Sequence, residues 1–230
     1  MNKMVEKTVV EEEEKQTINK KEVATDIFYG TVKGLGGLAL KTVSDLKIEG
    51  KDKIPIIGKA ILTTVSDNVF RDMLVISLTT GRKVHFMLHP KIMANPVAGP
   101  LLKSLGMIRG TKNKDDTEPI DKVFEILNQK GDLMGMTPEA KLDRETQLKS
   151  VAGIIKFAVA GRAPIVPLGI YTEKSKLFDL IPVPALRVKI GDPIEVDKKL
   201  NRDKYRDQRY ELAEGILKMI ESLKKKPEEF

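Results

Sequence analysis

The chain has 230 residues and a formal net charge of +7, with 41% hydrophobic and 32% charged residues, a balance typical of a soluble globular protein. It has no cysteine, which excludes disulfides, thiolate nucleophiles and sulfur-ligated zinc, and its two histidines are too few for a histidine-rich metal site. The positive charge favours an anionic membrane surface or phosphate groups as partners, or serves solubility alone. With no tryptophan and only 5% aromatic residues, the composition argues against a nucleic-acid partner.

The N-terminal region carries an acidic run, residues 11–14, where a secretory signal would have its apolar segment. No stretch of about 18 apolar residues, the length that a transmembrane helix requires, is present. We therefore expect a cytoplasmic protein that is free or bound peripherally to a membrane. Residues 1–22 are rich in charge and poor in apolar side chains, which predicts a disordered tail.

Residues 23–44 place apolar side chains at helical spacing, but they also contain Gly30, Gly34, Gly36 and Gly37. Each glycine costs a helix about 1 kcal/mol relative to alanine, so this segment needs a surface to pack on. One interpretation is an amphipathic membrane-interface helix or a lipid-facing hairpin. The other is a helix docked on the protein's own sheet, and the sequence leaves both open.

Residues 45–226 alternate strand-like and helix-like patterns without an internal repeat or a long linker. This alternation predicts one α/β domain with a mostly parallel or mixed central sheet flanked by helices. Residues 107–116 are expected to form a loop. The predicted strands cover residues 45–50, 60–65, 83–88, 132–136, 164–170 and 186–190, and the predicted helices cover residues 69–78, 96–105, 120–127, 149–160 and the region from Asn201 to residue 224.

Residues 60–72 read AILTTVSDNVFRD, which predicts a buried strand, a polar turn and the start of a helix. In open α/β sheets, such corners line the crevice where strand carboxyl ends and helix N-termini converge. Asp67 and Asp72 are therefore candidate catalytic residues, as an acid/base pair. Ser66 is an accessory candidate as a nucleophile, but no base adjoins it in sequence, so we expect a helix cap or turn residue.

Five further segments follow this corner. Residues 106–112 read GMIRGTK, residues 135–141 read GMTPEAK, residues 148–152 read LKSVA, residues 163–168 read APIVPL and residues 189–194 read KIGDPI. In this order they resemble the glycerolipid acyltransferase family, of the lysophosphatidate acyltransferase type, over about residues 27–196. The corner resembles the family's H-x-x-x-x-D motif, and the first two segments resemble its G-x-I-P-V-D-R and F-P-E-G-T-R-S motifs. The resemblance implies the family's α/β fold.

The resemblance also implies roles at the corner, where Asp72 aligns with the motif's aspartate and Asp67 with its histidine. In the family, the histidine takes the proton from the acceptor hydroxyl, and the aspartate orients it. An ordinary aspartate is too weak a base at pH 7, and losing a general base costs about 10²–10⁴ in rate. The segment that resembles F-P-E-G-T-R-S, called the third motif after the corner and the G-x-I-P-V-D-R segment, keeps Pro138 and Glu139. Four of its positions are altered: Thr137, Ala140, Lys141 and Leu142.

Four residues are candidates for substrate binding. Glu139 is the retained glutamate of the third motif. Arg109, Lys112 and Lys141 resemble phosphate-contacting positions of the family and suit a phosphate or a coenzyme A pyrophosphate. The alternative for each cation is a solvated surface side chain.

The two histidines differ in their expected roles. His89 follows the predicted strand 83–88, where the fold could bring it toward the crevice, so it is an accessory candidate as a base. His85 alternates with core positions on that strand and is expected to be structural.

Three functions remain open on the sequence. The first is acyl transfer from coenzyme A or acyl carrier protein to a lysophospholipid or glycerol phosphate at a membrane face. The second is a non-catalytic relative that binds lipid or acyl thioester. A third idea is transfer to an acceptor that supplies its own base, such as an amine. The acyl thioester is a substrate, so the resemblance implies no cofactor and no metal, and the sequence predicts no oligomeric state.

Overall fold

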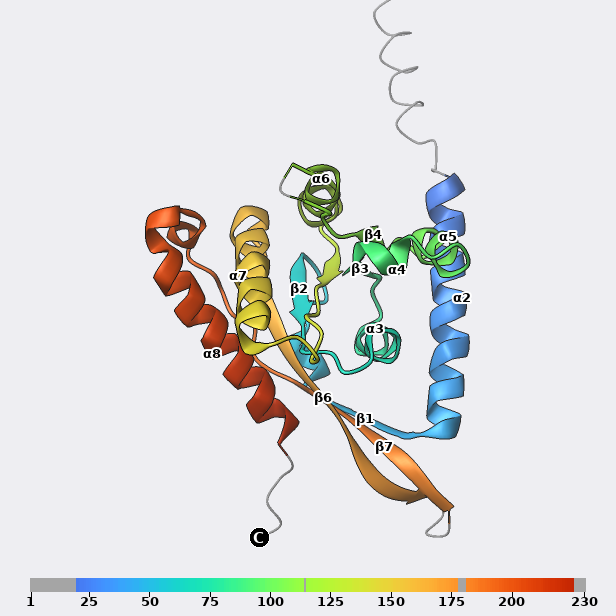
Figure 1. The fold of residues 1–230 in the computed structure, drawn as a ribbon. Helices are drawn as coiled ribbons and strands as arrows, with labels where there is room; N and C mark the ends of the chain where they lie inside the picture. The colour runs from blue at the N-terminus through green and yellow to red at the C-terminus, as the bar shows by residue number, and fades with distance from the viewer. Residues whose placement is uncertain (1–19, 114, 178–180, 226–230) are drawn as a thin grey trace, which may run out of the picture.

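The structure, a computed structural model, describes residues 20–113, 115–177 and 181–225, so residues 1–19 of the expected tail lie outside it. Within these ranges, seven strands form one sheet in the order β1-β7-β6-β2-β5-β3-β4 (Figure 1). Strands β6 and β7 are antiparallel, and the other neighbouring pairs are parallel. The expected α/β fold with a mixed central sheet is confirmed. The strands are β1 Asp45–Glu49, β2 Ala60–Thr63, β3 Val84–Leu88, β4 Ile108–Arg109, β5 Leu133–Gly135, β6 Ile165–Leu177 and β7 Ile181–Ile190.

Helices cover both faces of the sheet (Figure 1). Helices α2 to α5 contribute to the core on one face, and α6 to α8 contribute to the core on the other. The helices are α2 Lys20–Val43, α3 Val69–Leu78, α4 Pro90–Met93, α5 Ala98–Ser104, α6 Glu118–Phe124, which continues as the π-helix η2 Glu125–Lys130, α7 Arg144–Gly161 and α8 Arg206–Lys224. Three short 3-10 turns, η1 Lys51–Lys53, η3 Lys198–Asn201 and η4 Asp203–Tyr205, complete the elements.

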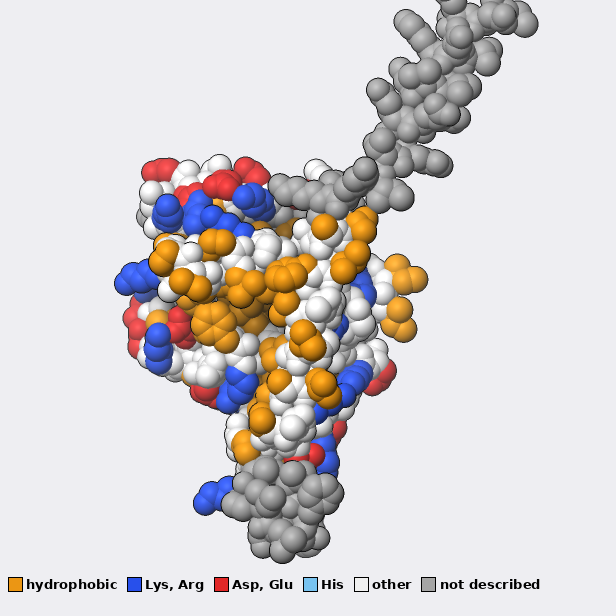
Figure 2. Space-filling model, turned by 90° about the vertical axis from the view of Figure 1, so that its right-hand side faces the viewer, with side chains coloured by type: hydrophobic (Ala, Val, Ile, Leu, Met, Phe, Trp, Pro, Cys, Tyr) orange, Lys and Arg blue, Asp and Glu red, His pale blue; other side chains and the backbone are white. Residues whose placement is uncertain are grey.

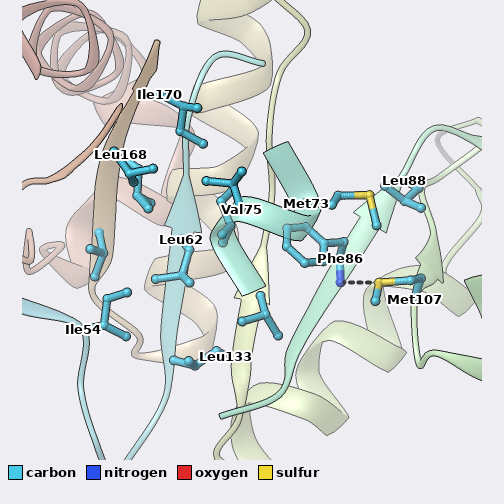
Figure 3. Packing of buried hydrophobic residues seen from close by; sticks show 14 of the residues in the cluster. Ile54, Leu62, Met73, Val75, Phe86, Leu88, Met107, Leu133, Leu168 and Ile170 are labelled. Carbon is cyan, nitrogen blue, oxygen red and sulfur yellow. Dashed lines mark hydrogen bonds between the residues drawn. The ribbon is translucent and has the colours of Figure 1, made fainter. Parts of the chain in front are cut away.

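Strand β2 lies in the middle of the sheet and is buried along its whole length. Its neighbouring side chains point to opposite faces, so Leu62 joins the core beneath α3 and Ile61 joins the core beneath α7 and α8. Figure 3 shows the first of these cores, where Leu62, Val75 and Phe86 converge. This burial on both faces explains why β2 reads as a continuous apolar and β-branched run rather than an alternating one.

The N-terminal segment forms one continuous helix, α2, and not a hairpin. Its inner side docks on the domain, because the buried Tyr29 hydroxyl accepts a hydrogen bond from the backbone N–H of Val84 at 3.1 Å. A Cβ at Gly37 would lie 2.7 Å from Leu78 Cδ2, so this glycine lets α2 approach α3 closely. The outer side leaves Leu35 and Leu38 exposed. No helix in the described part of the chain is both long and apolar enough to cross a bilayer.

Several expectations differ from the structure. The expected loop 107–116 contains β4, a strand that exists only through its pairing with β3. The C-terminal α-helix begins at Arg206 and not behind Asn201, because two 3-10 turns come first. The expected helix 96–105 is shorter: α5 starts at Ala98, and a separate short helix, α4, precedes it.

Candidate functional site

The expected strand-turn-helix corner is present and connects β2 to α3. Asn68 is the N-cap of α3, and its side chain accepts a hydrogen bond from the backbone N–H of Arg71 at 3.1 Å. The cap is therefore Asn68, and of the two expected structural roles of Ser66, helix cap or turn residue, the structure agrees with the second, since Ser66 lies between β2 and α3. Asp72 lies in the first turn of α3, on the side that faces the core.

The Asp72 carboxylate is buried, with 1% of the residue exposed, and both of its oxygens have partners. Ser66 Oγ donates to Asp72 Oδ2 at 2.8 Å, and Arg71 Nε donates to Asp72 Oδ1 at 2.8 Å. The guanidinium compensates the buried negative charge, and the hydroxyl satisfies the second oxygen. Ser66 therefore commits its proton to Asp72, and no hydrogen bond or ion pair joins a histidine to this carboxylate within the described residues.

The Asp67 side chain points away from this cluster and is 60% exposed. Its nearest cation is the ammonium of Lys224 at the end of α8, 3.9 Å from Asp67 Oδ2. Lys224 also donates a hydrogen bond to the carbonyl of Val65 at 2.7 Å. Within the described residues, no hydrogen bond or ion pair joins Asp67 to Asp72, so the structure does not bring the two together as an acid/base pair.

The third motif lies beside the corner. Its segment after β5 pairs with Ser66 as a short parallel bridge, in which Ser66 N–H donates to the Pro138 carbonyl and Ala140 N–H donates to the Ser66 carbonyl, both at 2.8 Å. Glu139, the partner of Ser66 in this bridge, forms an ion pair with Lys141 at 2.6 Å. The two motifs are thus joined through their main chains, although they lie about 70 residues apart in sequence.

An apolar groove opens next to Glu139 and has a volume of about 370 Å³. We call it the apolar groove. Its walls come from the start of α3, the end of β3 with α4, the third motif and α7. Most lining side chains are apolar, among them Val69, Ile92, Ile154 and Phe157, and Glu139 is the one carboxylate among the described lining residues. Such a groove suits an extended apolar chain with a polar end.

The family model described as Acyltransferase matches residues 45–171, more than half of the chain. The chain belongs to the acyltransferase family. Its fold is similar to that in the crystal structure of the 1-acyl-sn-glycerophosphate (LPA) acyltransferase PlsC from Thermotoga maritima, with a TM-score of 0.62 and 18% sequence identity over 93% of this chain and 86% of that chain. No curated protein matches the chain. The resemblance in the motifs is therefore confirmed for the family and for the fold.

In this acyltransferase fold, His89 lines the apolar groove, but one of its nitrogens is occupied. As the N-cap of α4, the ring accepts a hydrogen bond at Nδ1 from the backbone N–H of Lys91 at 3.2 Å. In the neutral ring, the remaining nitrogen, Nε2, then carries the proton, so it can donate to a ligand but cannot take a proton from one. This hydrogen bond disfavours His89 as a general base and leaves Nε2 as a possible donor to a ligand.

His85 is buried at the edge of a different cavity, away from the groove. Its Nδ1 lies 2.9 Å from the carbonyl oxygen of Gly106, and its Nε2 lies 3.4 Å from Asp132 Oδ2. The neighbouring imidazole holds the pKa of Asp132 below its usual range. The expectation that His85 is structural agrees with this placement.

The substrate-binding candidates fall into two places. Glu139 lies in the apolar groove, and Lys141, which is 79% exposed, is paired with it. Arg109 and Lys112 line instead a second recess, whereas Gly110 and Thr111 between them line the apolar groove. Arg109 is already bound by the carboxylates of Asp116 and Glu118. This pairing raises the pKa of Arg109 and lowers the pKa of Asp116 to about 2.

Sequence reasoning missed two residues of the corner, Arg71 and Lys224. The sequence does contain a signal for Arg71, because this cationic residue directly precedes Asp72. Lys224 has no such signal, since 159 positions separate it from the Val65 carbonyl that it contacts.

Proposed function

We propose that this member of the acyltransferase family binds an acyl thioester together with a lysophospholipid or glycerol phosphate, and that it does not perform the family's histidine-dependent transfer. The observation that carries this proposal is the arrangement around Asp72. Ser66 and Arg71 each donate to one oxygen of Asp72, no histidine contacts this carboxylate within the described residues, and Asp67 forms an ion pair with Lys224. A carboxylate that is hydrogen-bonded and paired in this way has no partner base to orient, and neither Asp67 nor His89 supplies a free base in the groove.

The apolar groove supports the binding half of the proposal. It is large enough to enclose part of an acyl chain, and Glu139 and the Nε2 of His89 provide polar groups at its wall. These groups suit the thioester end of the donor or the hydroxyl of an acceptor.

A membrane surface is the proposed place of action. Figure 2 shows hydrophobic side chains gathered over the face that α2 covers. Among them are the exposed side chains of Ile27, Leu35 and Leu38 of α2 and of Leu101 of α5. Phe70 of α3 is also exposed and adjoins Val69, which lines the apolar groove, so lipid could reach the groove from this face.

Acyl transfer is the second candidate, and one observation favours it. Glu139 lines the apolar groove, and its main chain is bonded to the corner, so its carboxylate could act as the base in place of a histidine. Its ion pair with Lys141 opposes that role, because a nearby cation stabilises the charged, weakly basic form. If transfer occurs by this route, Glu139→Gln removes it.

The binding proposal is tested by filling the groove. Gly153 of α7 lines it, and a Cβ there would have no neighbour within 4 Å, so Gly153→Leu projects into open space. We expect this variant to bind palmitoyl-coenzyme A at least about tenfold more weakly than the wild type in equilibrium dialysis.

The matched control is Gly215→Leu. Gly215 is also a helical glycine with nothing within 4 Å of a Cβ, but it lies on α8 and does not line the groove. Equal loss of binding in both variants, or no loss in Gly153→Leu, would contradict binding in the apolar groove.

A further inference from the structure

Strands β6 and β7 continue past the rest of the sheet as an antiparallel pair (Figure 1). Strand β2 pairs with β6 only as far as Pro167, and β1 pairs with β7 only from Ala185 onward. The pairing between β6 and β7 themselves extends to Leu177 and Ile181. We call the part beyond these neighbours, residues 172–177 and 181–184, the arm. Each of its strands has an outer edge that no other described strand covers.

The register of the arm shows which backbone groups point to these edges. Gly191 and Pro167 extend the register of the two strands, and the Gly191 N–H donates to the Pro167 carbonyl at 2.8 Å. In an antiparallel pair, residues whose backbone groups face the partner strand alternate with residues whose groups face away from it. Thr172, Lys174 and Lys176 therefore direct their N–H and C=O groups to the outer edge of β6.

The sequence blocks the outer edge of β7. Pro184 lies opposite Lys174 and Pro182 lies opposite Lys176, so the backbone nitrogens of both prolines point to that edge. Because proline has no N–H, this edge cannot complete a ladder with a further strand. The outer edge of β6 contains no proline within residues 168–177. A further strand can therefore join the arm on the β6 side only.

The open edge of β6 is cationic. No described residue forms a hydrogen bond with the main chain of Thr172 or Lys174 there. Lys174 is exposed, and its ammonium has no ion-pair partner among the described residues. Glu173, the one acidic residue of the arm, is already paired with Arg187 at 3.4 Å.

This charge selects the kind of strand that fits the edge. An antiparallel second copy of β6, centred on residues 174–176, would set Lys174 or Lys176 opposite a lysine of the copy, and like charges in opposite positions are unfavourable. Lysines on an edge strand oppose such self-pairing in general. A strand with carboxylates at alternate positions would instead place an opposite charge against each lysine.

We propose that the open edge of β6 in the arm is a docking site for an extended acidic segment of a partner protein, which joins the sheet as a further strand. Main-chain hydrogen bonds to Thr172, Lys174 and Lys176 supply affinity, and the carboxylates supply specificity. A two-stranded ribbon is only marginally stable in water, so a third strand also stabilises the arm. This surface is separate from the apolar groove, and the proposal goes beyond the proposed function.

The probe for this site is a fluorescein-labelled peptide, Val-Glu-Val-Glu-Val-Glu-Val, whose binding is measured by fluorescence polarisation at low salt. We expect saturable binding to the wild type. Lys174→Pro removes an outward N–H without touching the ladder with β7, and it should weaken binding at least about tenfold. Lys174→Gln removes the charge but keeps this N–H, so it should weaken binding by only about threefold.

Two controls separate strand pairing from charge. A peptide with N-methyl-glutamate at every glutamate position keeps all charges but loses the N–H groups that would face β6, and we expect it to bind at least about tenfold more weakly. Lys198→Gln changes the net charge as Lys174→Gln does, at an exposed position on η3 without a described partner. We expect this variant to bind the peptide as the wild type does.

The outcomes that would overturn the proposal are distinct. Wild-type binding by Lys174→Pro, or equal binding of the N-methylated peptide, would exclude strand pairing. An equal loss in Lys198→Gln would show a general charge effect. A wild type that sediments as a dimer, together with a monomeric Lys174→Pro variant, would assign the edge to a second copy. If Lys174→Pro does not fold, the two peptides still decide the question on the wild type.

Discussion

At the scale of single residues, Asp72 acts as an anchor of the corner. A buried carboxylate is costly unless it is hydrogen-bonded and its charge is compensated, and Ser66 and Arg71 supply these two conditions. The Asp72 side chain holds the turn against the helix through these two contacts. The contacts explain the buried carboxylate by structure without a reaction.

Ser66→Ala removes the hydroxyl that satisfies Asp72 Oδ2. We expect the free energy of unfolding to fall by about 1–3 kcal/mol, because a buried charged acceptor loses its partner. Urea unfolding measures the change as a shift in midpoint without a change in slope. The control is Ser104→Ala, whose exposed hydroxyl donates to the Leu101 carbonyl at 2.7 Å, and a shift as large in this variant would contradict the anchoring role of Ser66.

Asp116 gives a pH-dependent prediction. Arg109 lowers its pKa from the ordinary value of 3.8 to about 2 in the folded protein. Between these values the unfolded chain binds more protons than the folded chain, so this contribution to stability is present above 3.8 and is lost as the pH falls toward 2. Urea unfolding at pH 5 and pH 3 should show a smaller loss of stability for Asp116→Asn than for the wild type. Identical losses would mean that the Arg109 pair does not contribute.

At the scale of elements, the corner could be predicted because its signals are local. The apolar run of β2, the polar turn and the apolar spacing of α3 lie within about 20 consecutive residues. Strand β4 could not be predicted in this way, because two residues carry no periodicity and pair with β3 only after the chain has folded. Antiparallel pairing with β7 similarly carries β6 beyond the apolar core to Leu177, past the expected end at residue 170.

The sequence predicted some residues of the candidate site but not the contacts between their side chains. Motif resemblance marked Glu139 as a substrate-binding candidate, and the structure adds a bridge that joins it to Ser66 of the corner. The sequence did not reveal that Asp67 turns outward to Lys224 or that carboxylates bind Arg109, since such contacts depend on side-chain direction. The catalytic role of Asp67, the substrate-binding role of Lys141 and the accessory role of His89 stay predictions.

Helix α2 gives a prediction about packing. At Gly34 a Cβ would have no neighbour within 4 Å, whereas at Gly37 it would lie 2.7 Å from Leu78 Cδ2. Gly34→Ala should therefore stabilise the protein by up to about 1 kcal/mol through helix propensity. Gly37→Ala should gain less or destabilise, because its methyl group must displace Leu78. Thermal unfolding ranks the two variants, and equal gains would contradict close docking of α2 on α3.

At the scale of the whole molecule, the hydrophobic face over α2 is the feature that the fold itself leaves unexplained (Figure 2). Leu35 is 64% exposed on this face, and Met219, which is 37% exposed, lies on α8 across the sheet. Leu35→Asp should reduce flotation of the protein with anionic liposomes, because it places a charge at the apolar contact. Met219→Asp should float as the wild type does, and equal loss in both variants would remove this face as the membrane contact.

The central claim is that the groove binds an acyl thioester while the corner lacks a working base. Its most direct test is transfer of a labelled acyl group from palmitoyl-coenzyme A to lysophosphatidate, at protein concentrations where binding of the thioester is saturated. We expect a rate equal to that of the blank without protein. Turnover above this blank that Glu139→Gln or Asp72→Asn abolishes, with thioester binding retained, would contradict it.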